Sequence, residues 1–216
     1  TVDQPSVFES TRTFSVTALA SPKDRDGSEE VANIKLVISN SDLTSGSTFV
    51  VGTGAAAVTY SFVQSKDASN NLVPGQFELN LPKSYLTPVA GSINQTITGK
   101  ITTPAYFDGT LSVVASASAV EKADSTQVAT GSSAASSVVV VPVTDGLASF
   151  DTKGLSVIAG KPIGLDKLVT ALSSLDADET LSLTIGNIPS GSVLSNNGVS
   201  IGITNGSALI PNASLS

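Results

Sequence analysis

The chain has 216 residues, with 11 basic and 18 acidic side chains for a net charge of −7, and 40% of its residues are apolar. It contains no Cys, His, Met or Trp, which excludes disulfides, a Ser-His-Asp triad and the usual His/Cys zinc site. The negative charge argues against a nucleic-acid partner, and no apolar run is long enough to predict membrane insertion. The remaining metal chemistry is that of hard, oxygen-bound cations such as Ca2+.

Apolar and polar residues alternate along seven stretches of the first 145 residues. In chain order these are 13–19, 31–38, 58–63, 76–81, 93–101, 111–119 and 137–143. Alternation buries one face of a strand and leaves the other in water. With Gly, Asn, Asp, Pro and Ser between the stretches, the pattern predicts an all-β fold, an antiparallel β-sandwich of immunoglobulin type.

The alternation also predicts which side chains form the core. The expected core positions are Phe14, Val16, Ile34, Leu36, Ile38, Phe77, Leu79, Leu111, Val113, Val139, Val141, Leu183 and Ile185.

A domain boundary is predicted at Asp145-Gly146, dividing the chain into residues 1–145 and 146–216. Within the second part, residues 163–173 have apolar side chains at near-helical spacing, which predicts a short helix, with an irregular strand as the alternative. The second part lacks counterparts of the last strands of the first. We therefore expect tandem Ig-like sandwiches of which the second is incomplete, either split or truncated.

The two parts share a repeated acidic motif. Residues 24–30 (DRDGSEE) precede one predicted strand and residues 176–180 (DADET) precede another, 152 positions later. Such self-similarity is typical of tandem modules.

Calcium requires six to eight oxygen ligands, and the first acidic motif is suited to supply several of them. Asp24 and Asp26 can point into one concavity if Gly27 lets the loop curl, and Glu29 or Glu30 can close the site. The alternative is a solvated turn in which Asp-Gly is only a hairpin signal. The same two interpretations apply to the second motif, with Asp176, Asp178 and Glu179 as the ligands.

Topology suggests where this calcium site lies. If the first predicted strand (13–19) and the last (137–143) run in the same direction, the loop 21–30 and residues 143–145 share one pole. Asp145, and Asp151 beyond the boundary, would then complete the site of Asp24 and Asp26. A cation there would stiffen the junction between the two units.

The order of three short motifs resembles the Ig-like repeats of large RTX adhesins of Gram-negative bacteria. These motifs are DRDGSE at 24–29, IPSGSVL at 188–194 and FDGTLSV at 107–113. The resemblance implies a cadherin-like, calcium-rigidified module of a type I-secreted, biofilm-associated protein at the bacterial cell surface, whose partners are neighbouring Ig-like domains. The chain departs from the pattern in its second motif, which lacks Gly-Ser, and in its long segment 53–81.

Three functions follow from these features. The first is a non-enzymatic, calcium-stiffened extender or ligand-presenting module. The second is a ligand-binding domain of the same kind of adhesin, which would bind a host or cell-surface peptide or glycan through residues 53–81 or the second unit. The third is an enzyme acting through paired carboxylates, which we do not expect because the acidic residues cluster in turns.

Overall fold

The computed structural model describes residues 1–24, 26–143, 149–150, 160–164, 169–171 and 182–211. It falls into two units, Thr1–Val143 and Thr144–Ser216, so that the division lies close to the predicted boundary at Asp145-Gly146.

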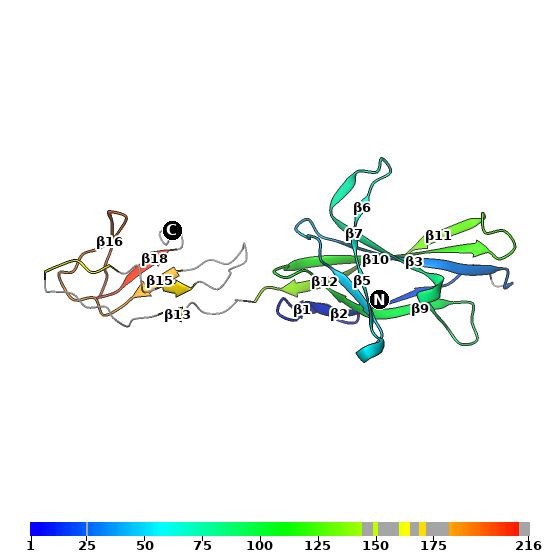
Figure 1. Cartoon of the computed structure of the whole chain (residues 1–216), viewed down its shortest axis with the longest axis horizontal. Coiled ribbons are helices and arrows are strands. Elements are labelled where there is room, and N and C mark those ends of the chain that lie inside the picture. The colour runs from blue at the N-terminus through cyan, green and yellow to red at the C-terminus, as the bar shows by residue number, and fades with distance from the viewer. Residues whose placement is uncertain (25, 144–148, 151–159, 165–168, 172–181, 212–216) are drawn as a thin grey trace. The chain divides into compact units, whose positions relative to one another are not determined.

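The first unit is a sandwich of two β-sheets (Figure 1). The larger sheet has the order β1 (Ser6–Phe8), β12 (Ser136–Val141), β10 (Gly109–Glu121), β3 (Glu29–Ser39), β7 (Leu72–Pro82) and β6 (Val63–Lys66), with β11 (Val128–Ser132) also paired to β10. The smaller sheet has the order β2 (Thr13–Ala20), β9 (Gln95–Thr102), β4 (Thr48–Val51) and β5 (Val58–Ser61), with β8 (Thr87–Pro88) also paired to β9. Two short 3-10 turns, η1 (Gly54–Ala56) and η2 (Lys83–Tyr85), complete this unit, which confirms the all-β prediction.

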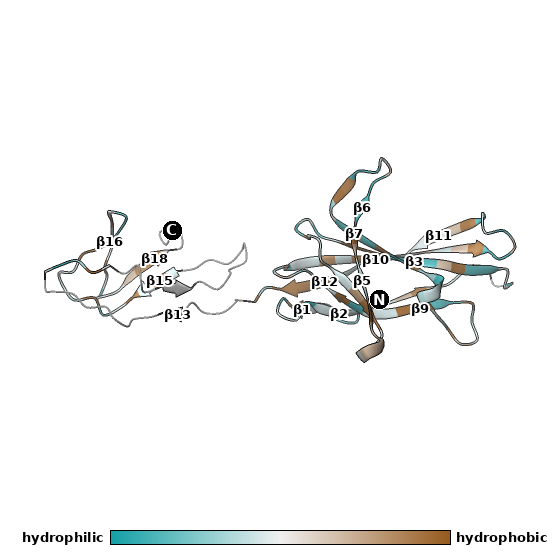
Figure 2. Ribbon diagram, viewed as in Figure 1, coloured by the Kyte–Doolittle hydropathy of each residue, from teal (hydrophilic) through white to brown (hydrophobic). Residues whose placement is uncertain are grey.

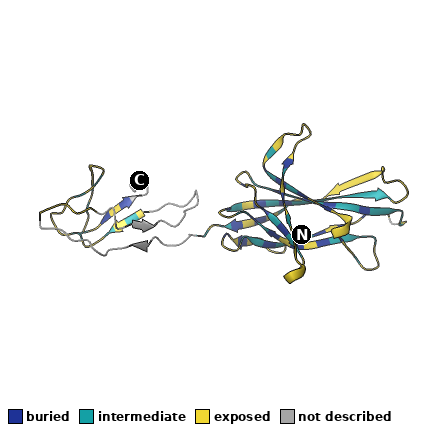
Figure 3. Ribbon diagram, viewed as in Figure 1, coloured by how far each residue is buried: buried dark blue, intermediate teal, exposed yellow. Residues whose placement is uncertain are grey.

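One core fills the space between the two sheets, because alternate residues of both sheets point inward. Figure 3 shows this as alternating buried and more exposed positions along the long strands. Nine of the predicted core positions are buried there: Phe14, Val16, Ile34, Leu36, Ile38, Phe77, Leu79, Leu111 and Val113. Phe49 and Ile101, from neighbouring strands of the smaller sheet, are fully buried in the same core.

The prediction for β12 is wrong by one residue. Val138 and Val140 are fully buried, whereas Val139 is 41% exposed and Val141 is half-buried. Figure 2 shows why: β12 is hydrophobic along its run and lacks alternation. Because a one-residue shift exchanges the two faces of a strand, a run of four valines does not specify which face is buried.

The first strand of the fold, β1, was not predicted, and it changes the topology. It runs parallel to β12, with Ser6 opposite Val139 and Phe8 opposite Val141. The chain then reverses in a turn in which the amides of Thr11 and Arg12 donate to the carbonyl of Phe8, and Arg12 has a φ of 48°. Consequently β2 runs in the opposite direction to β12.

The long strand β10 pairs with two strands along the same edge. Its first half pairs with β12, from Gly109 opposite Val140 to Val113 opposite Ser136, and its second half pairs with β11. On its other side it pairs with β3 over almost its whole length. The two ends of β10 therefore mark the two poles of the first unit.

In the second unit the described strands form three two-stranded sheets. These pairs are β13 (Ser149–Phe150) with β14 (Val169–Ala171), β15 (Ser182–Ile185) with β18 (Ala208–Pro211), and β16 (Leu194–Asn196) with β17 (Val199–Ile201). At Val169–Ala171 the predicted helix is wrong and the alternative, a strand, is found, in which Val169 and Thr170 are β-branched. Residues 165–168 and 172–173 of the predicted helix lie outside the described residues. The predicted core residues Leu183 and Ile185 are half-buried, while Ala208 and Ile210 are buried.

Candidate functional site

The acidic loop, defined as residues 21–28, joins β2 to β3 and carries the first predicted ligands. Asp24 and Asp26 are both exposed, and each carboxylate accepts a hydrogen bond within the loop. Asp24 Oδ1 accepts from the amide of Asp26 at 3.1 Å, and Asp26 Oδ1 accepts from the amide of Ser28 at 2.7 Å. Gly27 has a φ of 87°, so it permits the curl that the sequence predicted. The two carboxylates thus stand on successive turns of one short loop.

A lysine from the end of β10 already places positive charge beside this loop. Lys122 Nζ donates to the carbonyl of Gly27 at 2.5 Å, and the backbone amide of Lys122 donates to the carbonyl of Ser28 at 2.9 Å. The pKa of Asp26 lies below its ordinary value, first because of hydrogen bonding from Ser28, side chain and then backbone, and to a lesser degree because of Lys122. Asp26 is therefore ionised at neutral pH.

The two glutamates that follow the loop have different surroundings. Glu30 forms an ion pair with Lys83 in η2 at 2.5 Å, and the hydrogen bond from Lys83 lowers the pKa of Glu30. Glu29 lies directly opposite Glu121 in the β3–β10 ladder, and Glu121 Oε1 lies 3.3 Å from the hydroxyl of Ser28. Glu29 and Glu121 thus place two carboxylates opposite each other at this end of the sheet, and like charges in such a pair are unfavourable.

These carboxylates do not form a closed site. Within the described ranges, no three acidic side chains converge as a metal centre requires. Five of the predicted ligands, Asp145, Asp151, Asp176, Asp178 and Glu179, lie outside the described residues.

The predicted common pole of the acidic loop and the end of the last strand is wrong. Glu29, next to the loop, pairs with Glu121 at the end of β10, whereas Val140 pairs with Gly109 at its beginning. These ends are about 40 Å apart along a strand of this length. The cause is the chain reversal after β1, which makes β2 and β12 run in opposite directions. We call the two ends the acidic-loop pole and the Val143 pole.

The Val143 pole contains a buried carboxylate that the sequence analysis missed. Glu9 is only 5% exposed, its amide donates to the carbonyl of Val141 at 2.9 Å, and its Oε2 accepts from the amide of Val143 at 3.3 Å. Glu9 is therefore hydrogen-bonded to the backbone of Val141 and of Val143, the last residue of the first unit. The sequence gives little indication of it, because Glu9 follows a strand of only three residues.

A polar groove of about 620 Å³ on the outer face of the larger sheet was also missed. It crosses four strands, and its polar lining residues are Asn33, Lys35, Glu78, Asn80, Ser116, Ser118, Thr130 and Ser132. Lys35 and Glu78 form an ion pair at 3.4 Å, and the hydroxyl of Ser118 donates to Asn33 Oδ1 at 2.9 Å. We call this surface the outer groove. The polar positions that alternate with core positions on β3, β7 and β10 are its signal in the sequence.

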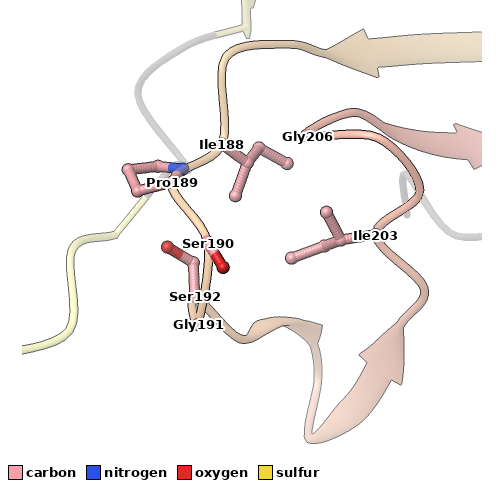
Figure 4. Close-up of a pocket in the computed structure, with 7 residues that line it drawn as sticks. All are labelled: Ile188, Pro189, Ser190, Gly191, Ser192, Ile203 and Gly206. Carbon is pink, nitrogen blue, oxygen red and sulfur yellow. The ribbon is translucent and has the colours of Figure 1, made fainter.

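The second unit has a smaller hollow of about 450 Å³ (Figure 4). Ile188 and Ile203 extend into it, and the turn Pro189-Ser190-Gly191-Ser192 forms one wall. Its lining contains no ionisable side chain, so its own residues provide no acid or base.

No protein-family model and no curated protein matches the sequence. Two solved structures are similar. The partial N-terminal region of the enterococcal surface protein has 12% identity and a TM-score of 0.34, and the match covers 65% of this chain and 41% of that one. The collagen-binding domain from a Staphylococcus aureus adhesin has 14% identity and a TM-score of 0.26, covering 62% of this chain and 93% of that one. Both scores are below 0.5, so these likenesses assign neither a family nor a function.

None of the described segments forms a helix with the length and hydropathy needed to cross a lipid bilayer.

Proposed function

We propose that this chain is a non-enzymatic extracellular module of a bacterial cell-surface adhesin, which spaces or presents other domains of the same protein. The observation that carries the proposal is the path of the chain through the first unit. Residues 1–3 run beside β2, β1 continues to the Val143 pole, and β12 leaves at that pole in the same direction. Because β1 and β12 both run toward the Val143 pole, the chain leaves the sandwich there along the direction of its strands, which suits a module connected in series to another domain.

The location can be tested on intact cells of the source organism. An antibody against this chain should label unpermeabilised cells, and proteases added outside should remove the label. Labelling only after permeabilisation would contradict the proposal.

Ligand binding is the alternative function, and the outer groove supports it. The groove offers hydroxyl, amide and paired charged groups but no aromatic ring, so it would bind a polar ligand such as a peptide backbone or a glycan through hydrogen bonds.

A glycan and peptide array, screened with calcium present, separates the two functions. The spacer proposal predicts no saturable binding. Binding that is lost in Asn80→Ala, but kept in the matched Asn94→Ala variant outside the groove, would favour the ligand-binding function. Asn80 lines the groove beside the Lys35–Glu78 pair, whereas Asn94 precedes β9 in the other sheet.

We also propose that the acidic loop binds Ca2+. The support is chemical: Asp24 and Asp26 are exposed carboxylates two residues apart, and Glu29 faces Glu121 across the adjoining ladder. A divalent cation would relieve this repulsion, and the charge of Lys122 already contributes a little to the lowered pKa of Asp26. Calcium held by Asp145, Asp151, Asp176, Asp178 and Glu179, which would stiffen the junction between the units, remains a separate proposal.

Calcium should raise the unfolding temperature of the first unit. That unit contains all three tyrosines of the chain, Tyr60, Tyr85 and Tyr106, so tyrosine fluorescence reports on it selectively. At about ten times the Kd, bound calcium would stabilise it by about 1.4 kcal/mol, and EDTA should remove this gain. The double variant Asp24→Asn/Asp26→Asn should lose the response, while Lys122→Gln should bind calcium more tightly because a competing charge is gone.

The matched control is Asp42→Asn, which removes an exposed carboxylate outside the loop. It should respond to calcium as the unmodified chain does. A calcium response that persists unchanged in the double variant would exclude the acidic loop as the site. Equal unfolding temperatures in calcium and in EDTA for the unmodified chain would rule out stabilising calcium binding altogether.

A further inference from the structure

Strand β11 forms an open edge of the larger sheet. All five of its residues are exposed, as Figure 3 shows, and it pairs with β10 on one side only. The amide of Ser133 donates to the carbonyl of Ala115, and the amide of Glu121 donates to the carbonyl of Gln127. In an antiparallel ladder the bonded positions alternate, so the backbone groups of Val128, Thr130 and Ser132 point away from β10.

These outward groups have no partner among the described residues of the chain. Three N–H and three C=O groups therefore form a regular row along the edge. Unpaired strand edges are templates for pairing with another chain.

The other edges of the first unit carry features that oppose such pairing. Strand β1 has three residues and follows Pro5, and β8 has two residues and ends in Pro88. Residues 1–3 cover part of β2, and β6 contains Lys66 and a register shift. Strand β5 presents fewer outward groups, since the bond from Phe62 to Ser47 leaves only Thr59 and Ser61 pointing outward. In contrast, β11 (VATGS) has no charge, no proline and no bulge.

We propose that β11 pairs antiparallel with β11 of a second copy of this chain, so that the two larger sheets become continuous. The outward set, Val128, Thr130 and Ser132, is symmetric about Thr130. In a two-fold pair, Thr130 would lie opposite Thr130 of the other copy, and Val128 opposite Ser132. All three outward positions then exchange both hydrogen bonds, so the edge is complementary to itself.

The charges around β11 are compatible with this arrangement. The charged loop that precedes β11, with Lys122 and Asp124, would face residues 133–136 of the second copy, which are uncharged. The antiparallel orientation also keeps the two acidic loops of the pair apart. Each outer groove, which includes Thr130 and Ser132, would continue into the other across the new strand pair.

The pairing can be tested by sedimentation equilibrium of the full chain over a wide concentration range. The measurements belong at about 0.15 M salt, where the Debye length is about 8 Å and the net charge of −7 is largely screened. We expect a weak, reversible dimer, because one strand pair buries little surface. In 15N spectra, amide shifts that grow with concentration should centre on residues 128–132.

Thr130→Pro is the decisive variant. The amide of Thr130 points to solvent, so proline there removes an edge donor and breaks no β10–β11 bond. It should weaken dimerisation by at least about tenfold while the unfolding temperature stays unchanged. Thr130→Ala, which keeps the amide, should still dimerise.

Three results would overturn the proposal. One is a chain that remains monomeric at every concentration. The second is a dimer that is insensitive to Thr130→Pro. The third is a monomer whose β11 amides respond only to an added extended peptide, which would make the edge a site for another partner. If Thr130→Pro lowers the unfolding temperature, Ser132→Pro, which removes another of the three outward amides, replaces it in the same test.

Discussion

Replacing Gly99 with alanine is expected to destabilise the first unit by about 3 kcal/mol, the upper end of what overpacking usually costs. Gly99 lies in β9, where a Cβ atom would be 2.5 Å from Cζ of Phe49 and 2.6 Å from the carbonyl oxygen of Val50. Phe49 is fully buried and Val50 pairs with β9, so neither can move away without disturbing the core or the ladder. Urea unfolding followed by tyrosine fluorescence measures the loss.

Gly131→Ala is the matched control for this variant. Gly131 also lies in a strand, β11, but a Cβ atom there would meet nothing within 4 Å. Its stability should equal or slightly exceed that of the unmodified chain, since alanine restricts the unfolded chain more than glycine does. Equal losses in both variants would show that strand glycines matter for their backbone freedom and not for the close approach of Phe49.

Removing the carboxylate of Glu9 is also expected to lower the free energy of unfolding substantially. In Glu9→Ala, the amide of Val143 loses the acceptor that it has in the buried side chain. A buried hydrogen bond to a charged group contributes substantially, so we expect a loss of about 2 kcal/mol in the free energy of unfolding. The amide of Val143 should also exchange with deuterium faster than that of Val139, which remains bonded to Pro5.

Glu9→Gln separates the hydrogen bond from the charge. Glutamine keeps an acceptor oxygen at nearly the same position, so it should lose less stability than alanine and protect the amide of Val143 better. If alanine and glutamine were equally destabilising, the negative charge itself, and not its bond to Val143, would be the important feature of Glu9.

Alternation decided how much of each strand could be predicted from the sequence. In β2, in the Ile34–Ile38 part of β3 and in the Phe77–Leu81 part of β7, the buried residues recur at every second position, so both the strand and its buried face were predicted. Strand β12 has four consecutive valines, which predict a strand but not its face. Strand β11 has no buried residue and β1 has only one, so neither has a hydrophobic pattern to detect.

In the candidate site, the contacts between sequence neighbours could be predicted, and the contacts between distant residues could not. The curl of the acidic loop follows from Asp24, Asp26 and Gly27, which are neighbours in the sequence. Lys122 and Glu121 reach the loop from more than 90 residues away, through the register between β3 and β10. The prediction of a common pole depended on the direction of β2, and that direction is set by the unpredicted strand β1.

The parallel pairing of β1 with β12 bears on how the first unit resists tension. When the chain is pulled at Thr1 and beyond Val143, β1 is drawn toward one pole and β12 toward the other. The bonds between them, from Val139 to Pro5 and from Glu9 to Val141, lie across the direction of the force. They are therefore loaded together in shear and cannot open one at a time like a zipper. This geometry gives the unit mechanical strength along the direction of its strands.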